Sequence, residues 1–410
     1  MRITHVAATR NSESSAAWRI LTAQRQAGIE ASALVHINSN NMPNTEVFPD
    51  RGVFRNYKSA AIKNSVIRKL TRLNNTKLPW SYSYFSGTNF ENILHFNPEV
   101  INIHWIPSVL DLSKIHKINK PIVITLHDVW PLTGGCHCNL DCGNWKSGCS
   151  NCPQNSQLEK YRLSAEYNWQ VKYKSFKKIN NLSAVAPSNW MGAMARESPL
   201  FEDRVVSVIP NCADSKIFFP REKLSCKREL GISDKKFNLL YVVSGNINQH
   251  HKGIDLLKSV LRNEKISFSN FQLLVVGQSQ NDFKDIQGVE IKYLGEIKSQ
   301  EQMSLIYNAS DLMISTSRQD NLPNTLVEAS LCGLPIVAFD VGGISDIVQV
   351  NLNGRLVAMG NITEMARVIF EMSQIAFDPG ELSASALKRF SFENCARNYL
   401  NHYLKIVSVD

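Results

Sequence analysis

One segment, residues 309–346, constrains the fold more than any other part of the chain, because strand-like and helix-like patterns alternate within fewer than forty residues. Leu312 to Ile314 is a short apolar run typical of a buried strand, and a polar turn follows it. Pro323 predicts the start of a helix, since a proline in the first helical position loses no hydrogen bond. Gly333 ends that helix, and Ile336 to Phe339 predicts the next strand. Strands that alternate with helices predict an α/β fold.

Two acids and two glycines stand at the turns of this segment. A helix entered from a strand points unpaired N–H groups and a partial positive charge above the sheet, so an anion such as a diphosphate is the natural guest. Asp320 precedes the helix, and Glu328 lies in its second turn, where a carboxylate can accept hydrogen bonds from sugar hydroxyls. Taken singly, Asp320 could be a helix cap and Glu328 a solvated side chain. Gly342 and Gly343 allow backbone to approach a ligand closely.

The same residues resemble the signature of the retaining nucleotide-sugar glycosyltransferases of family 4. The matching positions are Asp320, Leu322, Pro323, Asn324, Glu328-Ala329, Gly333-Leu334-Pro335-Ile336-Val337-Ala338 and Gly342-Gly343. In that family the first acid lies near the transferred sugar, the second contacts the ribose, and backbone between them holds the diphosphate. The resemblance implies catalytic roles for Asp320, where the family usually has a glutamate, and for Glu328. It also implies donor binding by Leu322, Pro323, Asn324, Thr325 and Glu328.

The composition is that of an ordinary soluble globular protein. The 410 residues are 43% hydrophobic and 20% charged, and the length is sufficient for two domains. The N-terminus lacks an apolar run of signal-peptide length, and the sequence has no uninterrupted apolar segment of about eighteen residues. These features predict a cytoplasmic protein. Its nine cysteines are then expected to be reduced thiols or metal ligands rather than disulfides.

The net charge of +9 is concentrated in the first half of the chain. Residues 1–210 hold 24 Lys and Arg against 14 Asp and Glu, and the remainder holds 21 against 22. Between Arg51 and Phe90 there are basic residues but no acid, and Ile62, Val66, Leu70 and Leu73 have helical spacing. This predicts a basic amphipathic helix. It could be the solvated outer face of the fold, or it could contact anionic lipid at about 1 kcal/mol per basic residue. Nucleic acid is a weaker third alternative, because no nucleic-acid-binding motif accompanies the charge.

The beginning of the chain has the pattern of a doubly wound sheet. Arg2 to Ala8 predicts a strand, Ala16 to Ala27 a helix, and Ala33 to Ile37 a second strand. Val100 to Trp105 and Ile122 to Leu126 are continuous apolar runs, as in parallel strands covered on both faces. A helix-compatible stretch, residues 109–118, separates them, and a long basic helix is predicted over residues 158–179.

His127 directly follows the second of these apolar runs and is followed by Asp128. Residues beyond the carboxyl end of such a strand face the crevice where doubly wound sheets bind ligands. A lone histidine is more often structural, but this position favours a function. His127 also resembles the donor-facing histidine of family 4, which implies a catalytic role.

A cysteine-rich loop, residues 134–153, comes next and places five cysteines within seventeen residues. Cys149 and Cys152 have the C-x-x-C spacing that lets two thiolates share one tetrahedral ion. With Cys136 and Cys142 they would complete a structural zinc site. The alternatives are reduced thiols in a tight loop and, less favoured, a catalytic thiol. Similar loops occur in a bacterial subset of family 4 that builds surface polysaccharides.

The segment Pro210 to Asp214 resembles the family's crossing between domains. It predicts an acceptor-binding domain over residues 1–211 and a nucleotide-sugar-binding domain over residues 212–410, with the last helix, about residues 391–407, packing back on the first domain. In the second domain we expect Gly245 and Lys252 to bind the donor, the lysine as a point charge on the diphosphate. Asn246 stands where the family usually has an arginine. The compensating residue could be His250, His251 or a remote arginine.

The resemblance covers nearly the whole chain and implies the GT-B architecture, two Rossmann-like doubly wound domains facing across a cleft. It implies retaining transfer of a sugar from a nucleoside diphosphate sugar to a glycan or lipid-linked acceptor in exopolysaccharide, O-antigen or capsule biosynthesis. No catalytic metal ion and no nucleic-acid partner are expected, and the anionic inner face of the cytoplasmic membrane is a candidate surface. The alternatives are a GT-B sugar-nucleotide epimerase and a zinc-stabilised scaffold that binds nucleic acid or another partner.

Overall fold

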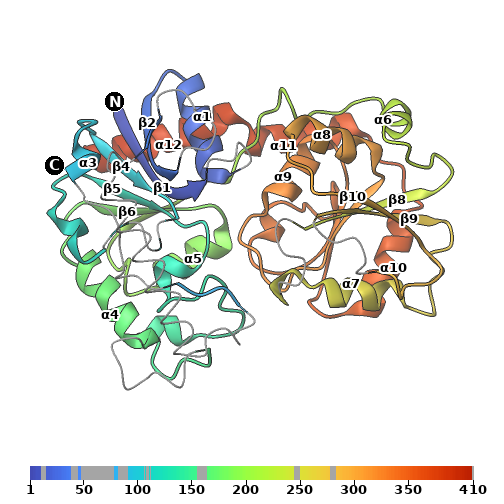
Figure 1. Ribbon diagram of the computed structural model, residues 1–410, viewed down its shortest axis with the longest axis horizontal. Coiled ribbons are helices and arrows are strands. Elements are labelled where there is room, and N and C mark those ends of the chain that lie inside the picture. Colours follow the sequence, from blue (N-terminus) through green and yellow to red (C-terminus); the bar gives the residue numbers. More distant parts are fainter. Residues whose placement is uncertain are drawn as a thin grey trace. The chain divides into compact units, whose positions relative to one another are not determined.

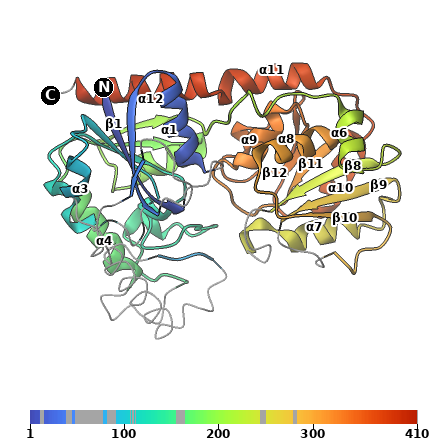
Figure 2. The same ribbon diagram turned by 45° about the horizontal axis from the view of Figure 1, so that its top comes forward.

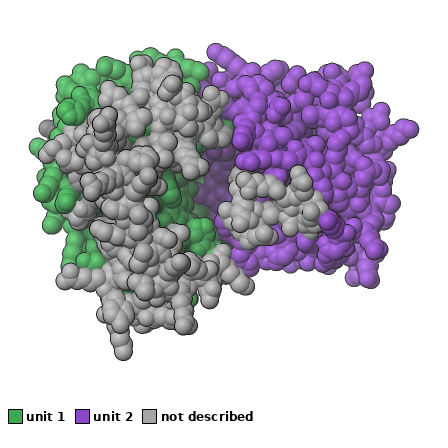
Figure 3. All heavy atoms as spheres, in the orientation of Figure 1, with its two compact units in different colours: residues 1–210, 395–410 green, residues 211–394 purple. Residues whose placement is uncertain are grey.

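The computed structural model describes residues 1–10, 15–37, 45–47, 78–81, 91–105, 107, 110, 112–154, 164–243, 250–277 and 283–408. The chain divides into two compact units (Figure 3). Unit 1 comprises residues 1–210 and 395–410, and unit 2 comprises residues 211–394. Each unit is a parallel sheet covered by helices, so the predicted α/β architecture of two Rossmann-like, doubly wound units is confirmed.

The sheet of unit 1 has seven parallel strands in the order β3-β2-β1-β4-β5-β6-β7 (Figure 1). They are β1 (Arg2–Arg10), β2 (Glu30–Ile37), β3 (Thr45–Val47), β4 (Val100–Ile103), β5 (Ile122–Thr125), β6 (Leu182–Ala186) and β7 (Val205–Val208). The order reverses between β1 and β4. The carboxyl ends of these central strands are therefore the place where a doubly wound sheet binds ligands. Every residue of β4, β5 and β6 is buried, as their apolar runs predicted.

Helices cover both faces of this sheet (Figures 1 and 2). Helices α1 (Ala16–Gln26) and α12 (Phe392–Val407) lie on one face, and α4 (Ala165–Phe176) and α5 (Asn189–Glu197) lie on the other. Helix α12 begins within unit 2, and from Cys395 onward its residues belong to unit 1. A short helix, α3 (Glu91–Leu94), precedes β4.

Two predicted helices of this unit differ from the structure. The basic helix expected over residues 158–179 begins at Ala165, because the Ser164 hydroxyl caps it by accepting from the Tyr167 N–H. Residues 155–163 lie outside the described part of the chain. The stretch expected as a helix over residues 109–118 is a 3-10 helix, η2 (Leu112–Lys117).

The sheet of unit 2 has six parallel strands in the order β10-β9-β8-β11-β12-β13. They are β8 (Phe237–Val242), β9 (Phe271–Val276), β10 (Glu290–Gly295), β11 (Leu312–Ser315), β12 (Ile336–Phe339) and β13 (Gly354–Val357). The order reverses between β8 and β11, so the loops after these two strands meet at the switch point. Strand β13 was missed in the sequence, because a four-residue run with one arginine and partial burial has no clear strand pattern.

Helices also cover both faces of the second sheet (Figures 1 and 2). One face carries α6 (Lys223–Glu229), α8 (Gln300–Ala309), α9 (Asn324–Leu331) and α11 (Pro379–Phe390). The other carries α7 (Ile254–Leu261) and α10 (Ile362–Met372). The two groups bury separate apolar clusters on either side of the sheet.

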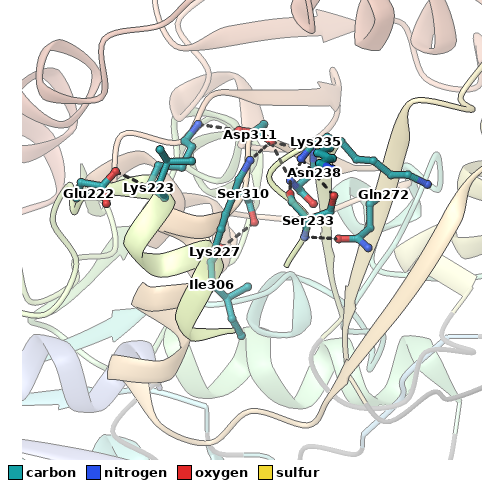
Figure 4. Close-up of polar contacts among 12 residues, drawn as sticks. Glu222, Lys223, Lys227, Ser233, Lys235, Asn238, Gln272, Ile306, Ser310 and Asp311 are labelled. Carbon is teal, nitrogen blue, oxygen red and sulfur yellow. Dashed lines mark hydrogen bonds and ion pairs between the residues drawn. The ribbon is translucent and has the colours of Figure 1, made fainter. Parts of the chain in front are cut away.

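Asp311 organises the amino-terminal edge of this sheet, just before β11 (Figure 4). It accepts from the ammonium groups of Lys223 and Lys227, each at 2.9 Å, and from the N–H of Asn238 at 2.8 Å. Burial acts to raise the pKa of the Asp311 carboxyl, but the lysines and the N–H outweigh it and hold that pKa below its ordinary value. This cluster stabilises the end of the sheet opposite to the switch point.

Candidate functional site

A lysine and an aspartate meet at the switch point of unit 2. Lys252 ends the 3-10 helix η6 (His250–Lys252), after β8, and Asp320 lies in the turn after β11. Lys252 Nζ donates to Asp320 Oδ2 at 2.8 Å, and both side chains are about one-fifth exposed. The structure therefore pairs two residues that the sequence singled out separately, and it leaves them accessible to solvent.

The backbone of Lys252 is fixed against the end of β11. The Tyr241 hydroxyl donates to the Lys252 carbonyl at 3.2 Å, and the Thr316 hydroxyl donates to the Gly253 carbonyl at 2.9 Å. Gly253 has φ +68°, and a Cβ at this position would lie 1.9 Å from the Thr316 carbonyl oxygen. Glycine is therefore required here by both the torsion and the close approach.

Arg318 ties the same loop to the turn after β11, and no motif in the sequence indicated it. Its guanidinium donates to the carbonyl of His250 and to Oδ1 of Asp255, both at 2.8 Å, and its backbone N–H donates to the carbonyl of His251 at 2.7 Å. Burial, followed by the nearby Lys252 ammonium, lowers the pKa of His251 to about 4. His251 is therefore neutral at pH 7 in this arrangement.

The start of α9 is held by the segment that begins unit 2. Pro323 has ψ 121° and is the N-cap residue, so the helix begins at Asn324, one residue later than predicted. The Asn211 amide donates to the Leu322 carbonyl at 2.9 Å and to Asn324 Oδ1 at 3.0 Å. Leu322 is buried, and Thr325 in the first turn is half-buried. The first turn of α9 is thereby fixed beside Asp320.

Glu328 is buried, with 5% of its surface exposed, so its interpretation as a solvated helix residue is wrong. The hydroxyl of Tyr307, on α8, donates to Glu328 Oε2 at 2.7 Å. A buried carboxylate held by a neighbouring helix has a fixed orientation, which a ligand-binding acceptor requires. No local pattern indicated Tyr307, because the pairing joins two helices.

The two glycines after β12 contact the backbone of Asp320. Gly342 has φ +57°, and a Cβ there would lie 1.8 Å from the Asp320 carbonyl oxygen. The N–H of Gly343 donates to the same carbonyl at 3.0 Å. Both glycines thus help the β12 loop to hold the backbone of Asp320, and the close approach of a ligand to them stays a prediction.

Two sets of predicted residues lie outside the described part of the chain. They are Gly245 with Asn246, and the basic segment over residues 51–77. Their roles stay predictions.

His127, in unit 1, is half-buried at the carboxyl end of β5 and belongs to a chain of three histidines. Its Nε2 lies 2.8 Å from Nδ1 of His104, which follows β4. The Nε2 of His104 lies 2.8 Å from Nδ1 of His5 in β1, and His5 Nε2 lies 2.9 Å from Oε1 of Gln24. Burial lowers the pKa of His5 and of His127 to about 4 and that of His104 well below its ordinary value. All three rings are therefore neutral at pH 7.

Asp128 points to a different cluster, also missed in the sequence. Its Oδ1 accepts from the Trp130 N–H at 2.8 Å, and its Oδ2 lies 2.7 Å from His137 Nδ1. His137 Nε2 lies 2.9 Å from the hydroxyl oxygen of Ser81. These contacts join residues 78–81 to the cysteine-rich loop.

The four cysteines predicted to bind zinc come together. Cys136, Cys142, Cys149 and Cys152 line one pocket. The Gly134 N–H donates to Cys149 Sγ at 3.1 Å, a contact that orients this sulfur. Among the described residues, however, no three His, Cys, Asp or Glu side chains are arranged so that they could hold a metal ion.

The thiols of this loop form no disulfide, and burial keeps those of Cys136 and Cys149 neutral. All nine cysteines lie within the described ranges and none forms a disulfide. Burial raises the pKa of Cys149 to about 12 and raises that of Cys136 further. Lys172 is buried beside them: its ammonium donates to the Thr133 carbonyl at 2.8 Å and lies 3.7 Å from the centre of the Trp130 ring.

Comparison with known proteins places this arrangement in a family. Residues 238–374 match the family model described as "Glycosyl transferases group 1". The chain is 24% identical over 327 residues to the putative colanic acid biosynthesis glycosyl transferase WcaC of Escherichia coli (strain K12), with 76% of each chain covered. Residues 238–374 are a group 1 glycosyltransferase domain. Lys252, Asp320 and Glu328 all lie within the matched region.

A second relative is N-acetyl-alpha-D-glucosaminyl L-malate synthase of Bacillus anthracis. This glycosyltransferase chain is 22% identical to it over 213 residues, which cover 50% of this chain and 55% of the relative. The match thus spans about half the length of that protein.

Among solved structures, the glycosyltransferase is similar to Anabaena Alr3699/HepE in complex with UDP, with a TM-score of 0.63, 15% identity, and coverage of 99% of this chain and 100% of that one. The same Anabaena protein has been solved with UDP-glucose, with a TM-score of 0.60. At this identity the likeness shows the fold alone. That fold is GT-B, as the sequence predicted.

Proposed function

We propose that this glycosyltransferase takes a sugar from a nucleoside diphosphate sugar and transfers it, with retention of configuration, to a glycan or a lipid-linked acceptor. The observation that carries the proposal is the pairing of Lys252 with Asp320 beside the first turn of α9, at the switch point of the sheet in unit 2. A cation and a helix start together suit a diphosphate. The complexes of Anabaena HepE with UDP and UDP-glucose support a donor of this class.

The largest charge that develops during such a transfer is on the leaving diphosphate. As the bond from the anomeric carbon to the diphosphate breaks, Lys252 and the N–H groups of the first turn of α9 stabilise the departing oxygens. The acceptor oxygen bonds to the same face of the anomeric carbon, and its proton passes to a leaving phosphate oxygen. The nucleoside diphosphate and the glycosylated acceptor then account for every atom. No separate base is required.

Asp320 and Glu328 have different parts in this proposal. Asp320 holds Lys252 before the donor arrives, and its carboxylate is placed to contact the transferred sugar. Glu328 accepts from the ribose hydroxyls, with Tyr307 fixing its orientation. His127 is retained as a catalytic residue of unit 1.

A screen of nucleoside diphosphate sugars by thermal shift, followed by product analysis, tests the function. A true donor raises the melting temperature by an amount set by its concentration over its affinity. Transfer predicts a glycosylated product and a free nucleoside diphosphate. An epimerase would instead yield an isomeric nucleotide sugar, and a nucleic-acid-binding scaffold would bind nucleic acid with steep salt dependence and would be indifferent to Glu328.

A structural zinc ion held by Cys136, Cys142, Cys149 and Cys152 is also proposed. The four thiols share one pocket, and they would have to rearrange to close on one ion. Within the described ranges Lys172 forms no ion pair with a carboxylate, so a thiolate cluster of negative charge would supply its missing counter-ion.

The cellular site proposed is the inner face of the cytoplasmic membrane, in exopolysaccharide, O-antigen or capsule biosynthesis. The excess of basic residues in residues 1–210 supports contact with an anionic surface, and the likeness to WcaC supports the pathway class. In the part of the chain that the structure describes, no helix has both the length and the apolarity to cross a bilayer. The binding that we propose is peripheral and reversible.

A further inference from the structure

The histidine chain of unit 1 spans its switch point. His5 lies on β1, and His104 and His127 follow β4 and β5, so the three rings cross three adjacent strands. Successive ring centroids are 5.1 Å apart, with interplanar angles of 12° and 26°. The first two rings are only 3% exposed, whereas His127 is half-buried. The chain thus leads from the interior to the edge where a ligand is expected.

Hydrogen bonds at the buried end of the histidine chain determine which nitrogen of each ring carries the proton. The amide nitrogen of Gln24 donates to the hydroxyl of Tyr403 at 3.0 Å, which leaves Oε1 of Gln24 facing His5 Nε2 at 2.9 Å. An amide oxygen can only accept, so His5 carries its proton on Nε2. Tyr403 also accepts from the Asn102 amide at 2.7 Å, and this places the phenol firmly between the two amides.

The positions of the remaining N–H protons follow, because each neutral imidazole ring carries one. His5 Nδ1 is unprotonated and accepts from His104 Nε2. His104 Nδ1 is then unprotonated and accepts from His127 Nε2. His127 is left with its proton on Nε2, directed inward, and with Nδ1 as its unprotonated nitrogen.

We propose that His5 and His104 are positioning residues that hold His127 in the Nε2–H tautomer, so that His127 Nδ1 accepts a hydrogen bond from a hydroxyl group of the substrate. The inference rests on the proposed function for the identity of that substrate, a hydroxyl-rich sugar. It goes beyond that function because it assigns roles to His5, His104 and Gln24. A neutral acceptor at this place favours a hydroxyl and disfavours a carboxylate, which has no proton to donate.

The tautomer can be measured without any enzyme assay. In the full-length protein labelled with 15N-histidine, two-bond 1H–15N correlation at pH 7.5 distinguishes protonated from unprotonated ring nitrogens, and His127→Ala identifies the signals. We expect His127 with a protonated Nε2 and an unprotonated Nδ1. The Nδ1–H tautomer, or a rapidly exchanging mixture, in the parent protein would overturn the inference.

Two substitutions of Gln24 then test the chain. Gln24→Glu keeps an acceptor for His5 Nε2 and should preserve the His127 tautomer, whereas Gln24→Met removes the acceptor and should let His127 exchange between tautomers. Gln24→Met should also lower kcat/KM by roughly tenfold or more, as loss of the correct tautomer does in other enzymes. His402→Gln is the control, because that buried histidine of the same unit bonds Ser183 and Ser207 and stands outside the chain. It should leave the tautomer unchanged.

The outcomes separate this inference from the proposed function. If His127 keeps its Nε2–H tautomer and its rate in Gln24→Met, the positioning role is wrong although sugar transfer stands. If the tautomer responds as expected but no nucleoside diphosphate sugar is turned over, the proposed function fails and the tautomer control by the chain stands.

Discussion

Lys252 Nζ lies 2.8 Å from Asp320 Oδ2, and this contact joins the loops that follow β8 and β11, the two strands between which the sheet of unit 2 changes direction. The pair is one-fifth exposed and therefore available to a ligand. At the other end of β11, Asp311 is surrounded by Lys223, Lys227 and Asn238. One strand thus carries a structural acid before it and, after it, the acid that we propose contacts the ligand.

Removal of the Lys252 ammonium should weaken binding of the diphosphate and spare binding of the nucleoside. We expect Lys252→Ala to lose roughly tenfold or more in affinity for a nucleoside diphosphate, since a charged hydrogen bond is worth about 1.5–3 kcal/mol, and to bind the nucleoside unchanged. Calorimetric titration with both ligands measures this. Lys258→Ala, on the following helix α7, is the control. Equal losses for both ligands would place Lys252 away from the phosphates.

Removal of the Glu328 carboxylate should weaken binding of the ribose. Glu328→Ala should cost donor affinity about 1.5–3 kcal/mol, the range for hydrogen bonds to a charged group. The titration should be repeated with a 2′,3′-dideoxy nucleotide, for which the parent and the variant should bind alike. Tyr307→Phe should show a smaller loss, because it removes only the support of Oε2. Unchanged affinity for the natural nucleotide in Glu328→Ala would contradict the assignment.

Replacement of a cysteine that lines the pocket should affect zinc binding, whereas replacement of its neighbour Cys138 should not. Purified without chelator, the protein should carry about one zinc per chain, and Cys149→Ser should lower both the zinc content and the melting temperature. Cys138→Ser is the matched control, because Cys138 lies in the same loop but does not line the pocket. A metal-free parent protein of full stability and activity would leave the loop with ordinary thiols.

Stability of unit 1 should fall as the pH is lowered from 6.5 towards 4. The pKa of His5 is about 4 in the folded state and about 6.5 when unfolded, so the unfolded chain binds the additional proton within this window. At about 1.36 kcal/mol per pKa unit, His5 contributes about 3 kcal/mol above the window and nothing below it. All seven tryptophans lie in residues 1–210, so their fluorescence during urea unfolding reports unit 1. A midpoint independent of pH in this range would contradict neutral buried histidines.

The basic segment should control membrane binding. Liposomes with anionic lipid should sediment the protein at low salt, neutral liposomes should not, and added salt should weaken binding. Reversing Lys63, Arg68 and Arg72 to Glu should abolish sedimentation without changing the affinity for the donor. Sedimentation of this triple variant equal to that of the parent would show that the segment is a solvated face.

The sequence by itself determined the class of fold and much of the candidate site in unit 2. Continuous apolar runs such as Ile122 to Leu126 are typical of strands covered on both faces, and helix α12 begins and ends where its pattern predicted. Asp320, Glu328 and Lys252 were found because turn chemistry and helix starts are local in the chain. Local patterns also placed His127 at the end of a buried strand and four cysteines in one loop.

The tertiary structure alone decided which of these side chains meet. The pairs His5–His104, Tyr307–Glu328 and Asp128–His137 join segments that no periodicity relates, since strand order and helix packing bring them together. The requirement for glycine at position 342 also emerged only from the packing, because a Cβ there would meet the backbone carbonyl of Asp320. Secondary structure follows from neighbours in the chain, whereas hydrogen-bond partners and burial follow from the packing of elements distant in sequence.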